Sequence, residues 1–255
     1  MLLALDIGNT NVTLGVYDGK KLLFVSRMAT DRARMEDQYA IELRAILNLY
    51  NVPERGIDGC AVSSVVPAVN RTVLRAVKRL TGVDALCVGP DTKTGILIDR
   101  KTAEVIGADL LVGCVAAADM FEGPCIVLDM GTATKFMVID EERRLLGGAI
   151  APGVGISLEA LSSRTAQLPF ISLEAPRHVI GQNTIECMRS GVINGAAYMI
   201  DGMCDHIEEE LGEKCRVVAT GGLSREIVRQ CSRDITFCDT LLLDGLRILY
   251  ESNRS

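Results

Sequence analysis

Two short segments of the chain share one polar pattern at the end of an apolar run. The first reads DIGNTN from Asp6, and the second reads DMGTAT from Asp129. In each, the acid is followed two residues later by a glycine, Gly8 in the first segment and Gly131 in the second. A second apolar run and an acidic turn come next in both. A chain of 255 residues with this pattern twice is predicted to contain two copies of one hairpin unit, one per lobe.

The residue types in these hairpins favour phosphate binding. A tight turn of glycine, asparagine and threonine directs backbone N–H groups and hydroxyls inward, which binds an anion without a basic side chain. Glycine permits a close approach of the backbone, and a neighbouring aspartate can hold a metal ion that bridges phosphate oxygens. One such segment alone is equally consistent with a polar β-turn. The duplication favours two phosphate-binding hairpins that face each other across a nucleotide cleft.

A third segment with glycines, ATGGLS over residues 219–224, follows the run CRVVA and precedes a helical pattern. Glycines at a strand-to-helix turn allow a flat adenine or ribose to lie against the backbone, and the carboxyl end of a strand is a common place for ligands. A plain tight turn explains the same residues. The sequence contains neither a P-loop motif nor a strand followed by G-x-G-x-x-G.

The elements that must position these segments alternate between strands and helices. Apolar runs over 2–7, 12–17 and 21–27 predict an antiparallel meander, and the spacing of apolar residues over 35–50 predicts a helix. A strand, a helix and another strand are expected after it, at 58–66, 69–81 and 84–89. This order is typical of an α/β lobe.

The same order restarts at Cys125, with a meander to about residue 151, a long helix from Thr184, a strand at 215–219 and a final helix from about 241. Two lobes of like topology are therefore expected. Their boundary is expected within a helical pattern near residues 108–122.

Composition excludes several classes of protein. The chain carries 27 basic and 33 acidic residues, a net charge of −6, which argues against nucleic acid or an anionic membrane as the partner. No apolar run approaches the roughly 20 residues of a membrane span, and the start MLLAL is interpreted as a first strand and not a signal peptide. Nine scattered cysteines fit neither a disulfide framework nor a zinc site, and indicate small core residues in a reducing cytoplasm.

The segments, in this order, resemble the superfamily of sugar kinases, heat-shock chaperones and actin, and most closely the type III pantothenate kinases. The likeness extends over nearly the whole chain. The motifs that carry it are LDIGNTNVTLGVYDG at 5–19, TDR at 30–32, SSVVP at 63–67, VGPDTKTG at 88–95, Gly107-Ala108-Asp109, DMGTAT at 129–134, GGAIAPG at 147–153, SRTAQLP at 163–169, GQNT at 181–184 and ATGGL at 219–223. The implied fold is α/β, with duplicated ribonuclease-H-like (actin-like ATPase) lobes at 1–115 and 116–255 and an interlobe nucleotide cleft.

The resemblance implies ATP-dependent phosphorylation of the primary hydroxyl of pantothenate to 4′-phosphopantothenate, the first step of coenzyme A biosynthesis. It implies Mg²⁺ near Asp6 and a monovalent cation, potassium or ammonium, at Asp129. The residues implied to bind ATP are Asp6, Ile7, Gly8, Asn9, Thr10, Asn11, Val12, Thr13 and Thr132.

The resemblance also implies an acceptor site. Asp109 matches the acid of the family's Gly-x-Asp-Arg motif and would accept the proton of the hydroxyl. Judged from the residues alone, Asp109 is equally well explained as an acid favoured at a helix N-terminus by the macrodipole. The residues implied to shape the pantothenate pocket are Arg100, Gly107, Ala108, Asp109, Leu110 and Thr184.

The acceptor site departs from the family pattern at three positions. Leu110 stands where the family has arginine, Arg100 aligns with a tyrosine and Ala103 with a proline. An arginine at 110 would pair with the pantothenate carboxylate, which leucine cannot do. Three functions therefore stay open: a pantothenate kinase, a nucleotide-binding regulator or pseudokinase with a lost or altered acceptor site, and a kinase for a different small molecule.

The long helix from Thr184 carries Gly191, Gly195 and Gly202 at spacings that place them on one face. A glycine in a helix interior costs about 1 kcal/mol relative to alanine, so three of them suggest close approach by another backbone. Packing against the sheet of the same chain explains them equally well. Because the resembled family is dimeric, we expect a homodimer.

Overall fold

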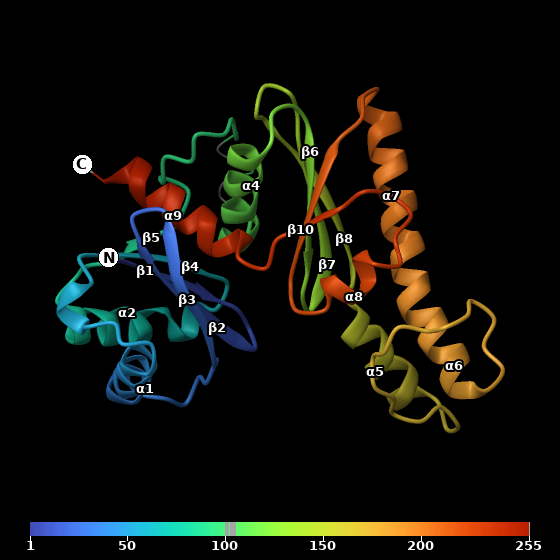
Figure 1. Ribbon diagram of the computed structural model, residues 1–255, viewed down its shortest axis with the longest axis horizontal. Coiled ribbons are helices and arrows are strands. Elements are labelled where there is room, and N and C mark those ends of the chain that lie inside the picture. The colour runs from blue at the N-terminus through green and yellow to red at the C-terminus, as the bar shows by residue number, and fades with distance from the viewer. Residues whose placement is uncertain (100–101, 103–105, 255) are drawn as a thin grey trace. The chain divides into compact units, whose positions relative to one another are not determined.

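The computed structural model describes residues 1–99, 102 and 106–254. Their contacts divide the chain into two compact units, Met1–Ala116 with Thr240–Ser255, and Ala117–Asp239. The division falls inside one helix, α4 (Ala108–Met120). Each unit is built around its own sheet (Figure 1).

The first unit contains a five-stranded sheet in the order β3-β2-β1-β4-β5. Its strands are β1 (Leu2–Ile7), β2 (Asn11–Asp18), β3 (Lys21–Ala29), β4 (Gly59–Ser64) and β5 (Leu86–Cys87). The first three strands form the antiparallel meander that the apolar runs predict, and β4 lies parallel to β1. The fifth strand is shorter than expected, with two residues.

The second unit repeats this topology. Its strands are β6 (Cys125–Met130), β7 (Ala133–Ile139), β8 (Leu145–Pro152), β9 (Arg216–Thr220) and β10 (Thr236–Phe237). Their order, β8-β7-β6-β9-β10, matches that of the first sheet, with an antiparallel β6–β7 hairpin and a parallel β6–β9 pair. The expected duplicated α/β fold is therefore confirmed.

Helices cover the first sheet on both faces (Figure 1). They are α1 (Glu36–Leu49), the short η1 (Glu54–Gly56), α2 (Pro67–Thr81), α4 and α9 (Leu241–Asn253). The helices α1 and α2 pack against each other, and Tyr39, Leu43 and Leu47 of α1 are fully buried. Tyr50, which the spacing places on the same face, caps the end of α1 and is exposed. Proline at the first position of α2 is favourable there because the first turn of a helix needs no N–H donor.

The last helix differs from the sequence-based expectation, which placed it in the second lobe. Here α9 packs against β1 and β4 and belongs to the first unit. The Tyr17 hydroxyl donates a hydrogen bond to Asp244 (2.8 Å). A Cβ atom on Gly245 would lie 2.2 Å from the carbonyl oxygen of Val112, so glycine lets α9 approach α4 closely.

The helices of the second unit are α5 (Val154–Arg164), α6 (Thr184–Arg189), the π-helix η2 (Ser190–Asn194), α7 (Gly195–Leu211) and α8 (Ser224–Val228). The long helix expected from Thr184 is thus α6, η2 and α7 in succession. Ile200 and Cys204 of α7 lie in one apolar core with Ile126 and Leu128 of β6.

No helix among the described residues is long and apolar enough to span a bilayer. Four of the nine cysteines, Cys60, Cys114, Cys125 and Cys204, are buried. Burial raises the pKa of the Cys125 thiol to about 12, which keeps it protonated at neutral pH. These buried thiols serve as small core residues, as expected.

Candidate active site

The first hairpin presents its polar turn to solvent and its apolar residues to the core. Asp6 pairs with Thr13 across the two strands, and the Gly8 N–H donates to the carbonyl oxygen of Asn11 (3.0 Å). Ile7 and Val12 are fully buried. Of the residues expected to bind ATP, these two can therefore reach a ligand through their backbone alone, whereas Asn9, Thr10 and Asn11 are exposed.

Two residues outside the hairpin hold it in place. Ser63 of β4 is fully buried, and its hydroxyl donates to Oδ1 of Asp6. The Thr30 hydroxyl donates to the Gly8 carbonyl (2.7 Å), while the Thr30 N–H donates to the carbonyl of Thr10 (2.9 Å). Thr30 lies in the motif TDR and Ser63 in the motif SSVVP, but neither residue was expected to contact the hairpin. Their place in these two motifs is the sequence signal that could have identified them.

The acceptor motif lies at the start of α4. Asp109 is in the first turn and is 8% exposed, and its Oδ1 accepts the N–H of Leu110 (2.8 Å). A Cβ atom on Gly107 would lie 2.4 Å from this same Oδ1. Any larger residue at 107 would displace the carboxylate. Glycine at position 107 therefore makes room for the Asp109 carboxylate and is not required by a left-handed backbone conformation.

The acceptor motif is adjacent to the first hairpin within the first unit. Val65 provides the connection: its N–H donates to the carbonyl of Ile7 (3.1 Å), and its Cγ1 lies 3.6 Å from a Cβ placed on Gly107. The fold thus brings Asp6 and Asp109 to the carboxyl end of the central strand β1. Arg100 and Ala103 lie outside the described residues.

The second hairpin has the same layout with a turn shorter by one residue. Residues 131–132 connect its strands, whereas residues 8–10 connect those of the first. Gly131 donates its N–H to the carbonyl of Ala133 (3.0 Å), and Thr132 is exposed. A Cβ on Gly153 would lie 2.3 Å from the Thr132 carbonyl, so the glycine that ends GGAIAPG lets the start of α5 approach this turn.

The segment ATGGLS lies directly beside the second hairpin. Thr220 pairs with Asp129 in the parallel β6–β9 ladder. Gly221 has a φ of +108°, and a Cβ there would lie 2.3 Å from the carbonyl of Met130. Gly221 is therefore required by the turn itself, whereas a Cβ on Gly222 would meet no described atom within 4 Å and its surroundings are open to a ligand.

Asp129 has a cationic neighbour that sequence reasoning missed. Lys135 stands directly opposite Asp129 in the β6–β7 ladder, and its Nζ lies 3.0 Å from Oδ2 of the acid. The two side chains are 22% and 15% exposed. Directly opposed residues in an antiparallel hairpin interact. Counting residues away from the turn along each strand would therefore have paired Asp129 with Lys135.

Thr184, the expected pantothenate residue of the second unit, is exposed at the first position of α6. Asn183 caps this helix by accepting the N–H of Glu186 (3.0 Å), which gives the GQNT motif a structural role as well. Thr184 also lines an open hollow of about 700 Å³. The hollow is lined by Leu161, Leu168, Gly181, Gln182, Asn183, Thr184, Cys187, Met188, Gly191 and Val192.

Comparison with known proteins connects this layout to one family. The family model of type III pantothenate kinases matches residues 2–206. A type III pantothenate kinase of Exiguobacterium is 41% identical over 255 residues, with full coverage of both chains. Two solved structures share the fold at low identity. A conserved Campylobacter jejuni protein described as a Baf family transcriptional activator has a TM-score of 0.64 at 17% identity, with 98% of each chain covered. The ROK hexokinase of Thermus thermophilus has a TM-score of 0.53 at 14% identity, again with 98% of each covered.

The two structural relatives bear on the fold alone, because both are below 25% identity, and they share that fold over nearly the whole chain. The family match carries the assignment, since it extends over most of the chain and includes both hairpins and the acceptor motif. The chain belongs to the type III pantothenate kinase family.

Proposed function

We propose that this protein transfers the γ-phosphoryl group of ATP to the primary hydroxyl of pantothenate, which yields 4′-phosphopantothenate and ADP. The observation that carries the proposal is the full-length family match, together with a nearly buried acid beside a phosphate-type hairpin. In this reaction the hydroxyl oxygen bonds to the γ-phosphorus, the bond to the bridging β,γ-oxygen breaks, and the hydroxyl proton leaves.

The exposed hairpin residues are proposed to bind the ATP phosphates. Asn9, Thr10, Asn11 and Thr132 offer side-chain donors, and the glycine N–H groups and neighbouring backbone offer the rest. The hydrogen bonds from the Thr30 and Ser63 hydroxyls to the first hairpin support this role, because phosphoryl transfer depends mainly on positioning and charge neutralisation. A hairpin fixed before ATP arrives loses less entropy on binding.

Asp6 fits the requirements of a magnesium ligand. The described residues contain no group of three or more His, Cys, Asp or Glu side chains arranged to hold a metal ion. Mg²⁺ in phosphoryl-transfer sites is usually bound through one or two carboxylates, substrate phosphates and water, which a single aspartate suits. When bound, the ion would neutralise charge on the transferring phosphate.

Asp109 is proposed as the general base that accepts the hydroxyl proton. Gly107 leaves open the space that Oδ1 of Asp109 occupies, and the Leu110 N–H donates a hydrogen bond to the same oxygen. Gly107, Ala108 and Leu110, with Arg100 and Thr184, are proposed to shape the pantothenate pocket. The hollow beside Thr184 supports a small-molecule role for that position.

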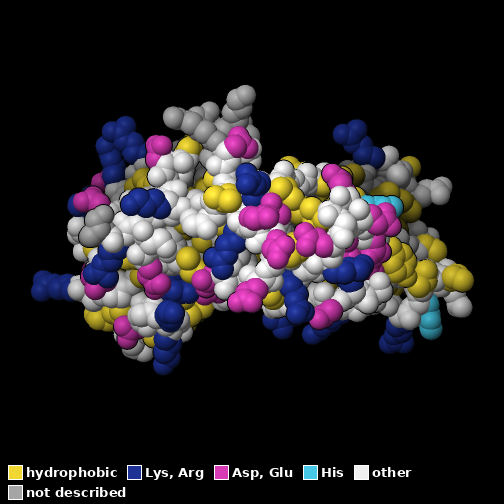
Figure 2. Space-filling model, turned by 90° about the horizontal axis from the view of Figure 1, so that it is seen from above, with side chains coloured by type: hydrophobic (Ala, Val, Ile, Leu, Met, Phe, Trp, Pro, Cys, Tyr) yellow, Lys and Arg dark blue, Asp and Glu magenta, His cyan; other side chains and the backbone are white. Residues whose placement is uncertain are grey.

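The protein is proposed to act as a homodimer through the face of η2 and α7 that carries the helix glycines. A Cβ on Gly191, Gly195 or Gly202 would meet no described atom of the chain within 4 Å, so packing within the described chain does not explain them. Exposed apolar residues gather in the same unit, at the right-hand end of Figure 2. The exposed apolar residues of this unit include Ile150, Ile156, Leu161, Phe170, Val179, Ile180, Ile185 and Tyr198. Apolar surface of this kind is typical of an interface. The nine cysteines are scattered and fit no disulfide framework, which supports placing the enzyme in the cytoplasm.

The test is an ADP-release assay with ATP, magnesium and pantothenate. We expect pantothenate-dependent ADP formation that Asp6→Asn abolishes and Asp109→Asn lowers on the order of 10²–10⁴-fold, the usual contribution of a general base. Nucleotide binding without turnover of pantothenate would instead favour the regulator or pseudokinase. Turnover of another alcohol, with pantothenate inert, would favour a kinase for a different acceptor.

A further inference from the structure

The two hairpins differ in what lies opposite their acids. In the first, Asp6 stands across from Thr13 and accepts a hydrogen bond from the Ser63 hydroxyl, so both of these neighbours are neutral. In the second, the corresponding cross-strand position is Lys135, whose ammonium lies 3.0 Å from the Asp129 carboxylate. The duplication makes the comparison direct, because both acids occupy the next-to-last position of their strand.

A free monovalent cation at Asp129 does not fit this arrangement. A potassium or ammonium ion would have to share the carboxylate with the Lys135 ammonium, and two like charges in one partly buried site repel each other. The lysine ammonium has one positive charge, three donors and no acceptor, so it cannot serve as a ligand for a second cation. It does have the charge and chemistry of an ammonium ion, attached to the chain.

We propose that Lys135 supplies the positive charge at Asp129 and makes the enzyme independent of added potassium or ammonium. In this proposal the Lys135 ammonium of β7 takes the place of the monovalent cation expected at Asp129. The inference relies on the proposed kinase for its activity measurement only, since cation binding is also measured by protein stability.

The first experiment uses the wild-type protein in potassium chloride and in tetramethylammonium chloride at equal ionic strength. We expect kcat/KM for ATP and the Tm with Mg-ATP to be the same in both salts. Activation of several-fold by potassium or ammonium, or a Tm raised specifically by either ion, would overturn the proposal. If no phosphorylation of pantothenate is detected in any salt, the proposed function fails, and the Tm comparison still tests the cation.

The second experiment uses Lys135→Met, which keeps the length and apolar stem of the side chain and removes its charge. In potassium-free buffer we expect a loss of about tenfold or more in kcat/KM, as for removal of a charge-assisted hydrogen bond. Potassium or ammonium should then restore activity and raise the Tm, because an ion that binds only the folded protein stabilises it by mass action.

The matched control is Lys214→Met, since Lys214 also pairs with a glutamate of the second unit (2.7 Å) but is 86% exposed. It should respond to the two salts as the wild type does. A Lys135→Met protein that is stable and insensitive to both ions would show an ordinary cross-strand ion pair and would refute the proposed role.

Discussion

At the scale of single residues, the site depends on where one carboxylate points. Asp109 is nearly buried, and its Oδ1 lies where a side chain on Gly107 would otherwise begin. The Asp109 carboxylate therefore occupies the space left by the missing side chain of Gly107, and its Oδ1 accepts a hydrogen bond from the Leu110 N–H. The motif Gly107-Ala108-Asp109-Leu110 therefore retains Asp109 as the base. At position 110 it has an uncharged leucine where the family has an arginine.

Gly107→Ala is expected to lower kcat with little effect on the KM for ATP. The new methyl group would displace Oδ1 of Asp109, and a misplacement of about 1 Å costs on the order of 10²-fold in rate. Steady-state kinetics with both substrates would separate the two parameters. Gly155→Ala is the control, because a Cβ there meets no described atom and the residue lies in α5. An unchanged kcat in Gly107→Ala would contradict the proposed orientation of the base.

Leu110→Arg is expected to lower the KM for pantothenate. An arginine here would form a charge-assisted hydrogen bond with the substrate carboxylate worth about 1.5–3 kcal/mol, or about 10–150-fold in KM. Leu110→Met has a similar volume without the charge and should leave KM unchanged. If Leu110→Arg leaves the KM for pantothenate unaltered, position 110 does not contact the carboxylate, and the effect of this departure from the family pattern must lie elsewhere.

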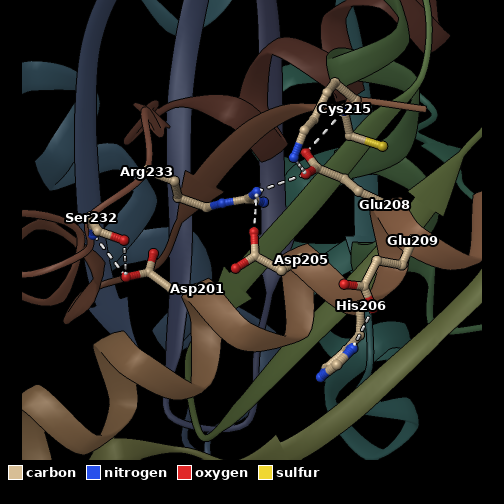
Figure 3. A network of polar contacts seen from close by, with 9 residues as sticks. Asp201, Asp205, His206, Glu208, Glu209, Cys215, Ser232 and Arg233 are labelled. Atoms are coloured by element: carbon tan, nitrogen blue, oxygen red, sulfur yellow. Dashed lines mark hydrogen bonds and ion pairs between the residues drawn. The ribbon is translucent and has the colours of Figure 1, made fainter. Parts of the chain in front are cut away.

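At the scale of elements, a polar network connects α7 to the segments around β9 (Figure 3). Glu208 of α7 is 6% exposed and accepts hydrogen bonds from Lys214, the Cys215 N–H and Arg233. Arg233 also contacts Asp205 (3.1 Å). Burial alone would raise the pKa of the Glu208 carboxyl, but the three donors outweigh it and lower that pKa below its ordinary value.

The lowered pKa predicts a pH-dependent contribution of Glu208 to stability. A carboxyl whose pKa is depressed by folding stabilises the native state above its unfolded pKa, about 4.3, and loses that contribution as the pH falls through the folded value. Glu208→Gln should therefore lower the free energy of unfolding by about 1–3 kcal/mol at pH 7, and the gap to wild type should close below about pH 4. Urea unfolding at several pH values measures both.

Glu209→Gln is the control for this prediction, because Glu209 is a neighbouring glutamate of α7 whose side chain is 72% exposed and contacts only His206 among the partners drawn in Figure 3. Exposed pairs contribute little, so its free energy of unfolding should stay within about 1 kcal/mol of wild type. A gap for Glu208→Gln that stays constant from pH 7 to pH 3 would show that lost packing, not the charge, is responsible.

At the scale of the whole molecule, the open glycine face predicts self-association. Gly195→Leu should shift the protein from dimer to monomer at micromolar concentration, because the new side chain would fill the space through which another backbone approaches. Its own chain offers no described atom within 4 Å to clash with, and leucine has the higher helix propensity, so the fold should persist. Light scattering on a sizing column measures the mass. Arg71→Leu, which adds an exposed leucine to α2, should remain dimeric. A monomeric wild type would contradict the interface.

Local sequence patterns predict most of the strands, the longer helices and the kind of chemistry. Turns of glycine, asparagine and threonine after apolar runs are local signals, because a backbone that must approach a phosphate restricts the residue types at each position. The meander and the duplication could be predicted for that reason, and helix α1 could be predicted from the helical spacing of its apolar residues. The sequence motifs also pointed to the family, through residues that include Asp6, Asp109 and Asp129.

Which residues come into contact depends on the tertiary fold. An amphipathic helix such as α9 can cover any apolar sheet face, and only long-range packing placed it on β1 and β4. The Ser63 hydroxyl reaches Asp6 because β4 pairs with β1. Oδ1 of Asp109 occupies the space beside Gly107 because both residues lie at the start of α4. The Lys135 ammonium beside Asp129 depends on the register of a hairpin whose turn is one residue shorter than its copy. A sequence pattern gives the order of residue types, whereas the electrostatic interactions at a site depend on distances that are fixed only when the chain folds.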